Sequence, residues 1–403
     1  MPSTLPEGES PPADGTLPED ARAEVVGRPL SIYLHVPFCS TRCGYCDFNT
    51  YTAAELGPGA TRTSYVDTAI AELDLAVRVL GSDAPEVSTV FVGGGTPTLL
   101  PPADLGRLLA AVRQRFGLTG DAEVTTESNP ESVTADDLAR LREAGFTRIS
   151  FGMQSAVPHV LTTLDRVHSP GRAAQAVADA RAAGFDQVSL DLIYGTPGES
   201  GADWAASLDA ALAAGPDHVS AYALIVEAGT RLATRVRRGE LPMPDEDDLA
   251  DKYLAAETRL TVAGFTAYEV SNWAVRPAAR CRHNLAYWRG DHWWGVGPGA
   301  HSHVGGVRWW NVKHPSAYAE RLVSGRTPAY AREVLTGEER RTERVLLELR
   351  LAEGLPTAVL SGTESRRVPD LVARGLAEVE NERLTLTLRG RLLADGVVRD
   401  LLD

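Results

Sequence analysis

The stretch Ser31-Ile-Tyr-Leu-His-Val-Pro-Phe-Cys39-Ser-Thr-Arg-Cys43-Gly-Tyr-Cys46-Asp-Phe48 decides the fold. Its three cysteines are separated by three and then two residues, and they directly follow the apolar, strand-like run 32–36. Thiolates at such short spacing can converge on one metal centre from a single loop, as iron–sulfur ligands do. A cubane has four irons, so three thiolates leave one iron open to a small molecule. The stretch therefore indicates a 4Fe–4S cluster held by Cys39, Cys43 and Cys46.

Two other uses of these cysteines fit the sequence less well. A structural zinc ion wants four closed ligands in paired groups, and here the second pair is missing because Cys281 has only His283 near it. A disulfide framework would leave one of the three clustered cysteines over, and a 403-residue chain does not need one. Cys281 is a less favoured ligand candidate, and the alternative is a small buried residue.

Short β-branched runs alternate with longer helical patterns between about residues 31 and 227. One helix is marked at both ends, because Thr134 and Asp137 form a start signal and Gly145 a stop signal around 135–144. Strands that alternate with helices predict a parallel sheet with helical crossovers. We therefore expect an α/β fold, a partial (β/α)6 barrel, with strands at 32–36, 87–92, 123–126, 148–151, 188–193 and 219–224.

Polar and glycine motifs stand at the end of every predicted strand. In parallel α/β barrels the active site collects at this end. The glycines of 93–97 permit close backbone approach to a ligand, while Glu127, Gln154 and Asp191 could bind its amine and hydroxyl groups. Neighbouring residues, such as Asn129, Pro130 and Ser155, are expected to cap and brace the loops.

The cysteine motif resembles the signature of the radical S-adenosylmethionine (SAM) superfamily. Its context, Tyr33-x-His35-Val-Pro-Phe-Cys39, resembles relatives of the oxygen-independent coproporphyrinogen dehydrogenase. That enzyme typically carries a further cysteine two residues after the third, where this chain has Phe48. The substitution resembles the HemW group of haem chaperones, and the likeness runs from about Arg28 to the C-terminus.

The resemblance implies a role for each strand-end motif. The glycine-rich loop would meet the amino-acid part of SAM, and four polar side chains match further SAM-contacting positions of the dehydrogenase family. An aromatic side chain beside the cluster and one backbone group near the adenine would complete the site. Whether one or two SAM molecules bind stays open. The residues are Gly94, Gly95 and Thr96, then Glu127, Gln154, Arg166 and Asp191, then Tyr33 and Ile225.

A second group of unusual residues follows the predicted barrel, where six of the seven tryptophans lie between Trp273 and Trp310. Aromatic residues at this density most often form core or interface packing. The motif His283-Asn-x-x-Tyr-Trp288, however, resembles the one that marks HemW proteins and is linked to haem binding. We therefore expect an aromatic-lined surface for a porphyrin with His283 as the candidate haem ligand, and with His301 and His303 as the next candidates.

Composition limits which partners and which cellular location fit the sequence. Residues 1–27 hold six acids, one base and five prolines, so we expect a disordered tail without a secretory signal. The net charge of −14 argues against nucleic acid as a partner, and no apolar run approaches the length of a membrane span. We expect a cytoplasmic protein with a barrel at 28–235, an aromatic-rich α+β region at 236–335 and a small helical and β-ribbon domain at 336–403.

Three functions from different classes remain. The first is a haem chaperone that binds haem and a SAM-ligated cluster and passes haem to an unidentified acceptor protein, free or membrane-bound. The alternative is an oxygen-independent coproporphyrinogen III dehydrogenase, a radical SAM enzyme. In the third reading the cluster is structural or redox-sensing. Phe48 and the His283 motif favour the chaperone, while the SAM-type residues are compatible with the enzyme.

Overall fold

The structure of the chain, a computed structural model, describes residues 6–56, 61–166, 169 and 171–402. Its centre is a run of six neighbouring parallel strands, each of which connects to the next through helical segments. All six lie where the sequence predicts strands, so the predicted α/β fold with a partial, open barrel is confirmed. The strands are β1 (Leu30–Val36), β2 (Val87–Gly94), β3 (Leu118–Ser128), β4 (Arg148–Gln154), β5 (Gln187–Tyr194) and β6 (His218–Ala223).

The crossover helices begin and end at local signals. The Thr134 hydroxyl accepts the N–H of Asp137, whose carboxylate accepts the N–H of Thr134, and Gly145 ends the helix in the left-handed region at φ 108°. Within the described ranges, no helix combines the length and the apolar character needed to cross a bilayer. The helices are α2 (Arg62–Leu80), α3 (Pro102–Phe116), α4 (Ala135–Ala144), α5 (Pro158–Thr163), α6 (Arg172–Ala182), α7 (Gly201–Ala213) and α8 (Arg231–Arg237).

The two faces of the barrel strands differ in chemistry. In β1, Ile32 and Leu34 belong to the large apolar core that also includes residues of the crossover helices α2 and α3. The alternate residues Ser31, Tyr33 and His35 point to the other face, because successive side chains of a strand alternate. The barrel interior is therefore polar and aromatic, and its rim at the carboxyl ends of the strands carries the candidate site.

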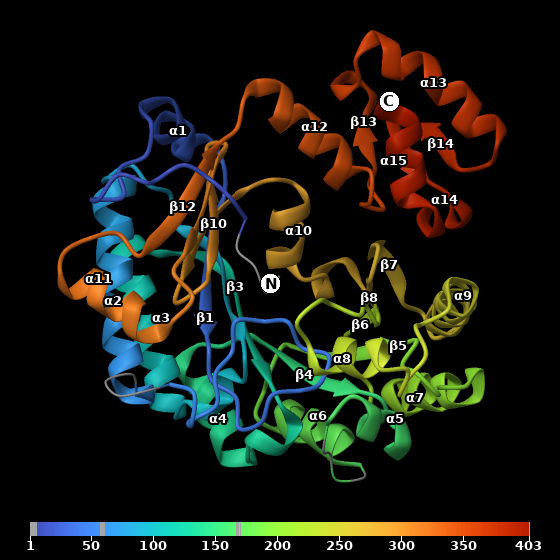
Figure 1. Ribbon diagram of the computed structural model, residues 1–403, viewed down its shortest axis with the longest axis horizontal. Coiled ribbons are helices and arrows are strands. Elements are labelled where there is room, and N and C mark those ends of the chain that lie inside the picture. The colour runs from blue at the N-terminus through green and yellow to red at the C-terminus, as the bar shows by residue number, and fades with distance from the viewer. Residues whose placement is uncertain (1–5, 57–60, 167–168, 170, 403) are drawn as a thin grey trace.

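The barrel is open between β1 and β6, and the segment 236–335 extends the sheet at both edges rather than forming a region of its own (Figure 1). β9 pairs with β1 in parallel, and β8 pairs with β6 in the antiparallel direction. An open edge offers unpaired backbone groups, so covering it satisfies them. The result is one sheet of twelve strands. Its added elements are α9 (Glu246–Val262), β7 (Thr266–Glu269), β8 (Asn272–Ala274), α10 (Arg282–Trp288), β9 (His292–Val296), β10 (His301–Val304), β11 (Val307–Asn311), α11 (Pro315–Val323) and β12 (Ala329–Val334).

The C-terminal segment has its own apolar cluster and a three-stranded antiparallel sheet of order β13-β15-β14. It lies at one corner of the molecule, coloured red in Figure 1. Arg391 joins it to the main sheet's side by an ion pair with Glu257 of α9 at 2.9 Å. Its elements are α12 (Gly337–Glu348), β13 (Leu355–Pro356), α13 (Gly362–Ala373), β14 (Ala377–Glu380), β15 (Arg383–Leu386), α14 (Leu388–Leu392) and α15 (Ala394–Leu402).

The expectation of a disordered N-terminal tail is wrong for residues 6–27. Glu9 exchanges backbone hydrogen bonds of 2.9 and 3.0 Å with Arg332 of β12, and the Glu24 carboxylate binds the Arg340 guanidinium through two bonds of 2.7 and 2.6 Å. Glu9 and Glu24 of this segment thus form ion pairs with arginines of the main body. A few buried apolar side chains of the segment also pack against the main body. It forms α1 (Glu19–Ala23) and a 3-10 turn (Glu24–Gly27), and its buried side chains are Leu17, Ala21 and Val25.

Candidate cluster and cofactor site

The loop that carries the three cysteines, residues 37–51, is held by backbone bonds to distant segments. Cys39 donates its N–H to the Tyr51 carbonyl at 3.0 Å, which closes the loop on itself. Gly44 donates to the carbonyl of Leu164, after β4, at 3.2 Å and accepts from the N–H of Leu232 in α8 at 2.8 Å. The middle of this cysteine loop is therefore clamped between two other parts of the barrel rim.

All three predicted ligands are free thiols and partly exposed. Burial, and then the neighbouring Cys43, raise the pKa of Cys39, while burial followed by the neighbouring thiols raises the pKa of Cys46 to about 12. In the part of the chain that the structure describes, they do not gather as ligands of a single metal ion. Ligands of a cubane each bind a different iron, so they need not gather around one ion.

The glycine-rich loop after β2 lies directly against the start of the cysteine loop. Gly95 donates its N–H to the Val36 carbonyl at 2.8 Å, and Thr96 donates to the Phe38 carbonyl at 2.7 Å. A Cβ at Gly95 would lie 2.4 Å from the Phe38 oxygen and 3.0 Å from the sulfur of Cys39. Only glycine therefore permits this approach of the two loops.

Two carboxylates face the barrel interior beside this loop. Glu127 accepts the N–H of Gly94 at 3.0 Å, and burial followed by the charge of Asp191 raises the pKa of Glu127 to about 8. The Asp191 oxygens accept from the Ser150 hydroxyl at 2.9 Å, and burial raises the pKa of Asp191 too. Two carboxylates at one end of a barrel repel each other and would gain from a cationic or hydroxyl-bearing ligand.

Arg166 and Gln154 lie on the same rim. Arg166 donates from Nη2 to the Gly152 carbonyl at 2.8 Å and from Nη1 to the Cys43 sulfur at 3.6 Å, while its buried Nε has no hydrogen-bond partner within the described residues. Gln154 stands at φ 63°, in the left-handed region that non-glycine residues rarely adopt. Strained backbone of this kind is concentrated at functional sites, which agrees with the predicted role.

Tyr33 is held in the barrel by a histidine that the sequence analysis does not place in the site. His35 donates from Nε2 to the Asn49 carbonyl at 2.9 Å, so its Nδ1 accepts from the Tyr33 hydroxyl at 3.0 Å. Burial lowers the pKa of His35 to about 4, which keeps the ring neutral. Asn49 in turn donates to the carbonyls of Pro298 and Lys313, both at 2.9 Å. No local spacing signals these long-range bonds, so sequence reasoning missed Asn49.

The mouth of the barrel exposes large apolar side chains. Phe48 in the cysteine loop is 47% exposed, and Ile225, which follows β6, is 66% exposed. Tyr222, near the end of β6, is also exposed in part. Large apolar side chains that stay exposed near a candidate site are candidates for ligand contact.

His283 lies in the floor of the barrel, where the structure places it away from any surface. The side chain is 1% exposed, and burial lowers its pKa to about 3. Nδ1 lies 2.7 Å from the Thr89 hydroxyl and Nε2 lies 2.9 Å from the Tyr287 hydroxyl. Both ring nitrogens are therefore engaged, and coordination of haem iron by His283 would require one of these bonds to break.

The prediction of an aromatic-lined porphyrin surface in residues 273–310 is wrong. Four of the six indole side chains in this segment are buried, and the other two are partly buried. His301 stacks on Trp310 with ring centroids 5.8 Å apart, and its Nε2 has no partner among the described residues. His303 is buried and donates from Nδ1 to the Asp291 carbonyl at 3.1 Å. Cys281 is buried. The buried tryptophans are Trp273, Trp294, Trp309 and Trp310.

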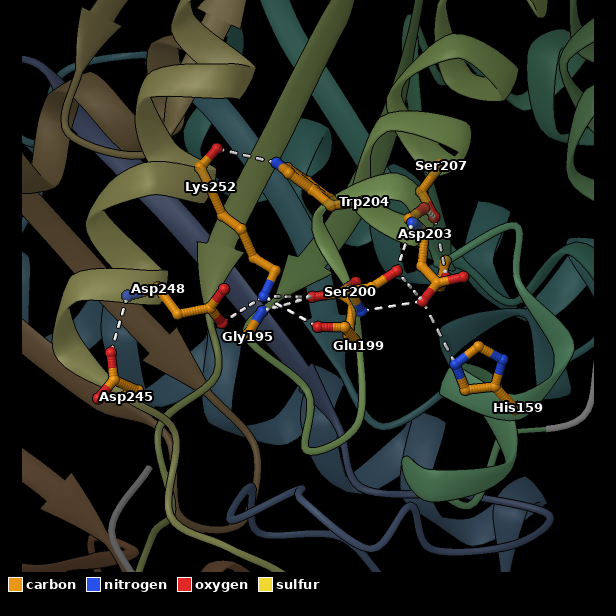
Figure 2. A network of polar contacts seen from close by, with 11 residues as sticks. His159, Gly195, Glu199, Ser200, Asp203, Trp204, Ser207, Asp245, Asp248 and Lys252 are labelled. Atoms are coloured by element: carbon orange, nitrogen blue, oxygen red, sulfur yellow. Dashed lines mark hydrogen bonds and ion pairs between the residues drawn. The ribbon is translucent and has the colours of Figure 1, made fainter.

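The loop after β5 is braced against α9 by a buried polar network (Figure 2). Glu199 accepts the N–H of Gly195 at 2.7 Å, and the buried Lys252 donates to the Glu199 carbonyl at 3.1 Å and binds Asp248. Burial raises the pKa of Glu199 to about 7. Because Asp191 lies on β5 just before this loop, the network fixes the strand end that carries one of the two site carboxylates.

The donor set fits a 4Fe–4S cluster with SAM. Three unbridged thiols lie on one loop, a glycine loop approaches the sulfur of Cys39, and the buried Nε of Arg166 lacks a partner within the described residues. Thiolates suit iron–sulfur clusters, and carboxylates suit amines and hydroxyl groups. The structure thus brings the predicted residues together at one rim, with Ile225 at its mouth and His283 beneath it.

Comparison with known proteins gives a matching family model and a similar solved structure. A family model of the radical SAM superfamily matches residues 33–211. The structure is similar to that of coproporphyrinogen III oxidase (HemN) from Escherichia coli, a radical SAM enzyme, with a TM-score of 0.80 and 25% identity over 94% of this chain and 92% of that one.

The curated relatives span nearly the whole chain. It is 57% identical to heme chaperone HemW of Mycobacterium tuberculosis over 380 residues, which cover 94% of this chain and 96% of the relative. It is 35% identical to radical S-adenosyl methionine domain-containing protein 1, mitochondrial, of Bos taurus, over 97% of this chain and 91% of the relative. At this identity and coverage, the chain belongs to the heme chaperone HemW family of the radical SAM superfamily.

Proposed function

We propose that this protein is a haem chaperone that binds haem and a SAM-ligated 4Fe–4S cluster and transfers the haem to an acceptor protein in the cytoplasm. The observation that carries the proposal is Phe48, an exposed apolar residue at the barrel mouth in the position where the dehydrogenase resemblance implies a cysteine. The 57% identity to a protein named heme chaperone HemW supports the same function.

Different residues of the rim would bind the cluster and SAM. Cys39, Cys43 and Cys46 would hold the cluster, which supplies one-electron chemistry and an open iron when bound. The backbone of the glycine loop would approach the amino-acid part of SAM, which Gly95 permits. Glu127 would accept hydrogen bonds from the cationic amine of SAM, a pairing that favours the ionised carboxylate.

The same proposal places the haem at the barrel mouth. A porphyrin is a flat apolar ring, and Phe48 and Ile225 offer exposed apolar surface beside the cluster loop. Both ring nitrogens of His283 are hydrogen-bonded in the floor of the barrel, so His283 would not be the haem-iron ligand in this proposal. A mouth site would also leave the haem accessible to an acceptor protein.

A second candidate is the coproporphyrinogen III dehydrogenase activity. The TM-score of 0.80 to the Escherichia coli enzyme favours it, together with the arrangement of the SAM-type residues on one rim. A decarboxylation assay with coproporphyrinogen III, SAM and a reductant separates the two candidates, because only the enzyme releases carbon dioxide from the propionates.

Haem titration of the anaerobically reconstituted full chain tests the chaperone. We expect binding in the parent and a loss of about tenfold in affinity in Phe48→Asp, since a buried carboxylate would face the apolar ring. The matched control is Val262→Asp, at an 85% exposed apolar residue of α9 outside the cysteine loop, and it should bind haem like the parent.

Three outcomes would contradict these assignments. Clear turnover of coproporphyrinogen by the parent would replace the chaperone with the enzyme. Absence of haem binding by the parent would remove both the chaperone and its mouth site. Equal haem affinity in Phe48→Asp and the parent would leave the chaperone but move the haem away from the mouth.

A further inference from the structure

The segment from Ala279 to Trp288 closes the barrel at the end opposite the cysteines. The Glu123 carboxylate of β3 accepts the N–H groups of Arg282 and His283, both at 3.1 Å, and the Cys281 thiol donates to it at 3.6 Å. Beside it, Arg148 of β4 donates from Nη1 to the Ala279 carbonyl at 2.8 Å. Arg148 begins β4, and Glu123 pairs with Thr89 near the start of β2, so α10 forms a floor under the barrel interior.

From this floor the His283 ring points into the barrel. The Thr89 hydroxyl donates to Ser31 at 2.9 Å, so its single proton is used and it accepts from Nδ1–H of His283. Nε2 then accepts from the Tyr287 hydroxyl at 2.9 Å. The imidazole is thus fixed in one tautomer and one orientation by β2 and by its own helix.

Above His283 lies a layer of rings. Phe91 of β2 stacks on the imidazole with centroids 5.1 Å apart and an interplanar angle of 23°, and Tyr33 lies 6.4 Å from it. Phe91 reaches the candidate SAM residues, because a Cβ at Gly93 would lie 2.9 Å from Phe91 Cε1 and 2.8 Å from Glu127 Oε2. The rings therefore lie directly beneath the carboxylate and the glycine loop.

We infer that His283 is a positioning residue for the SAM site: its ring supports Phe91 and Tyr33, and these hold the glycine loop and Glu127 in place. The inference rests on the proposed SAM site. In this role the His283 motif acts from within the barrel, and its imidazole contacts neither haem nor SAM. Removal of the His283 ring would be felt at the glycine loop through the packed rings, because a close-packed protein interior has low compressibility and transmits strain.

Three variants of the full chain test this role. His283→Ala removes the ring, and His283→Phe keeps a ring in the layer but cannot bind iron. Trp288→Phe is the control inside the same motif, because Trp288 packs with Leu285 and Leu351 outside the barrel interior. Each is assayed for hydrogen exchange of the Gly94 amide without cofactors, then for the SAM-induced change of the cluster spectrum and for haem binding after reconstitution.

We expect His283→Ala to speed exchange at Gly94 and to weaken the apparent SAM affinity, each by about tenfold, with haem affinity unchanged. His283→Phe and Trp288→Phe should stay within about twofold of the parent in all three measurements. If His283→Ala and His283→Phe both lose haem binding while the SAM response stays at the parent level, His283 is a haem ligand and the inference is overturned.

Two further outcomes are informative. Equal acceleration of Gly94 exchange in His283→Ala and Trp288→Phe would show a general loss of stability and would also overturn the inference. A parent cluster that does not respond to SAM would refute the proposed SAM site instead. In that case Gly94 exchange still decides whether His283 supports the glycine loop.

Discussion

Gly94 donates its amide hydrogen to Oε2 of Glu127 at 3.0 Å, and this bond ties the last residue of β2 to the end of β3. Gly94 adopts φ 111°, and a Cβ there would lie 2.6 Å from Nδ1 of His35. The histidine that orients Tyr33 therefore fills the space that a side chain at Gly94 would need. The conformation of the glycine loop and the protonation of Glu127 are therefore linked.

This link predicts a pH dependence of stability in the cofactor-free protein. Burial and then the charge of Asp191 raise the pKa of Glu127 from 4.5 to about 8, so the folded protein keeps a proton that the unfolded chain loses. The free energy of unfolding should therefore fall as the pH rises from about 4.5 to about 8. Urea unfolding across this range should show a shallower fall in Glu127→Gln, which carries no titrating group there.

The control for this measurement is Glu378→Gln, which removes an exposed carboxylate of β14 in the C-terminal domain. Its pH profile should follow that of the parent. A Glu127→Gln profile with the same slope as the parent's would mean that the carboxyl is ionised throughout this range in the folded protein.

The cluster assignment predicts a different result for each class of cysteine. Cys39→Ala, Cys43→Ala and Cys46→Ala should each lose most of the iron and sulfide after anaerobic reconstitution, because a second iron would lack a protein ligand. Cys281→Ala should keep the parent content, since the Cys281 thiol is buried against Glu123 in the floor. Full loading of Cys43→Ala, or loss confined to Cys281→Ala, would contradict the assignment.

Gly95→Ala should abolish the spectral response of the reconstituted cluster to SAM. The added Cβ would lie 2.4 Å from the Phe38 carbonyl oxygen, so the two loops must separate. Gly120→Ala is the matched control, because a Cβ there meets no heavy atom within 4 Å. A normal response in Gly95→Ala would show that the loops have room to move apart without losing the site.

The N-terminal segment should contribute to stability. Val25 is 1% exposed and Val26 is 64% exposed, so Val25→Ala should lower the free energy of unfolding by about 1–2 kcal/mol while Val26→Ala changes it little. Chemical denaturation of both variants measures the difference. Equal stabilities would mean that the segment detaches before the core unfolds.

The barrel could be predicted because its signals are local. Buried parallel strands are short β-branched runs bounded by turns, and Thr134 with Gly145 marks a helix to within its observed ends. The strand-end motifs could be placed at one rim for the same reason, since a parallel topology brings strand ends together, whereas their roles toward SAM follow from the family resemblance and stay predictions. None of this depends on contacts between distant segments.

What the sequence did not predict depends on such contacts. His283 lies in a short helix with no unusual local signal, and only its partners Thr89 and Glu123, from strands far upstream, place it in the floor of the barrel. Asn49 likewise gains its importance from the carbonyls of Pro298 and Lys313. The tail was expected to be disordered from its composition, which does not reveal that a few apolar residues have a place to pack.

The pairing of β1 with β9 has a consequence for biosynthesis. Leu30 pairs with His292, so the first strand of the barrel lacks one neighbour until most of the chain has been translated. At about 5–20 residues per second this interval lasts on the order of ten to fifty seconds. Throughout it the cysteine loop, which is anchored to Pro298 and Lys313 through Asn49, lacks those anchors as well. The nascent chain thus presents its thiols in a less constrained form than the finished protein.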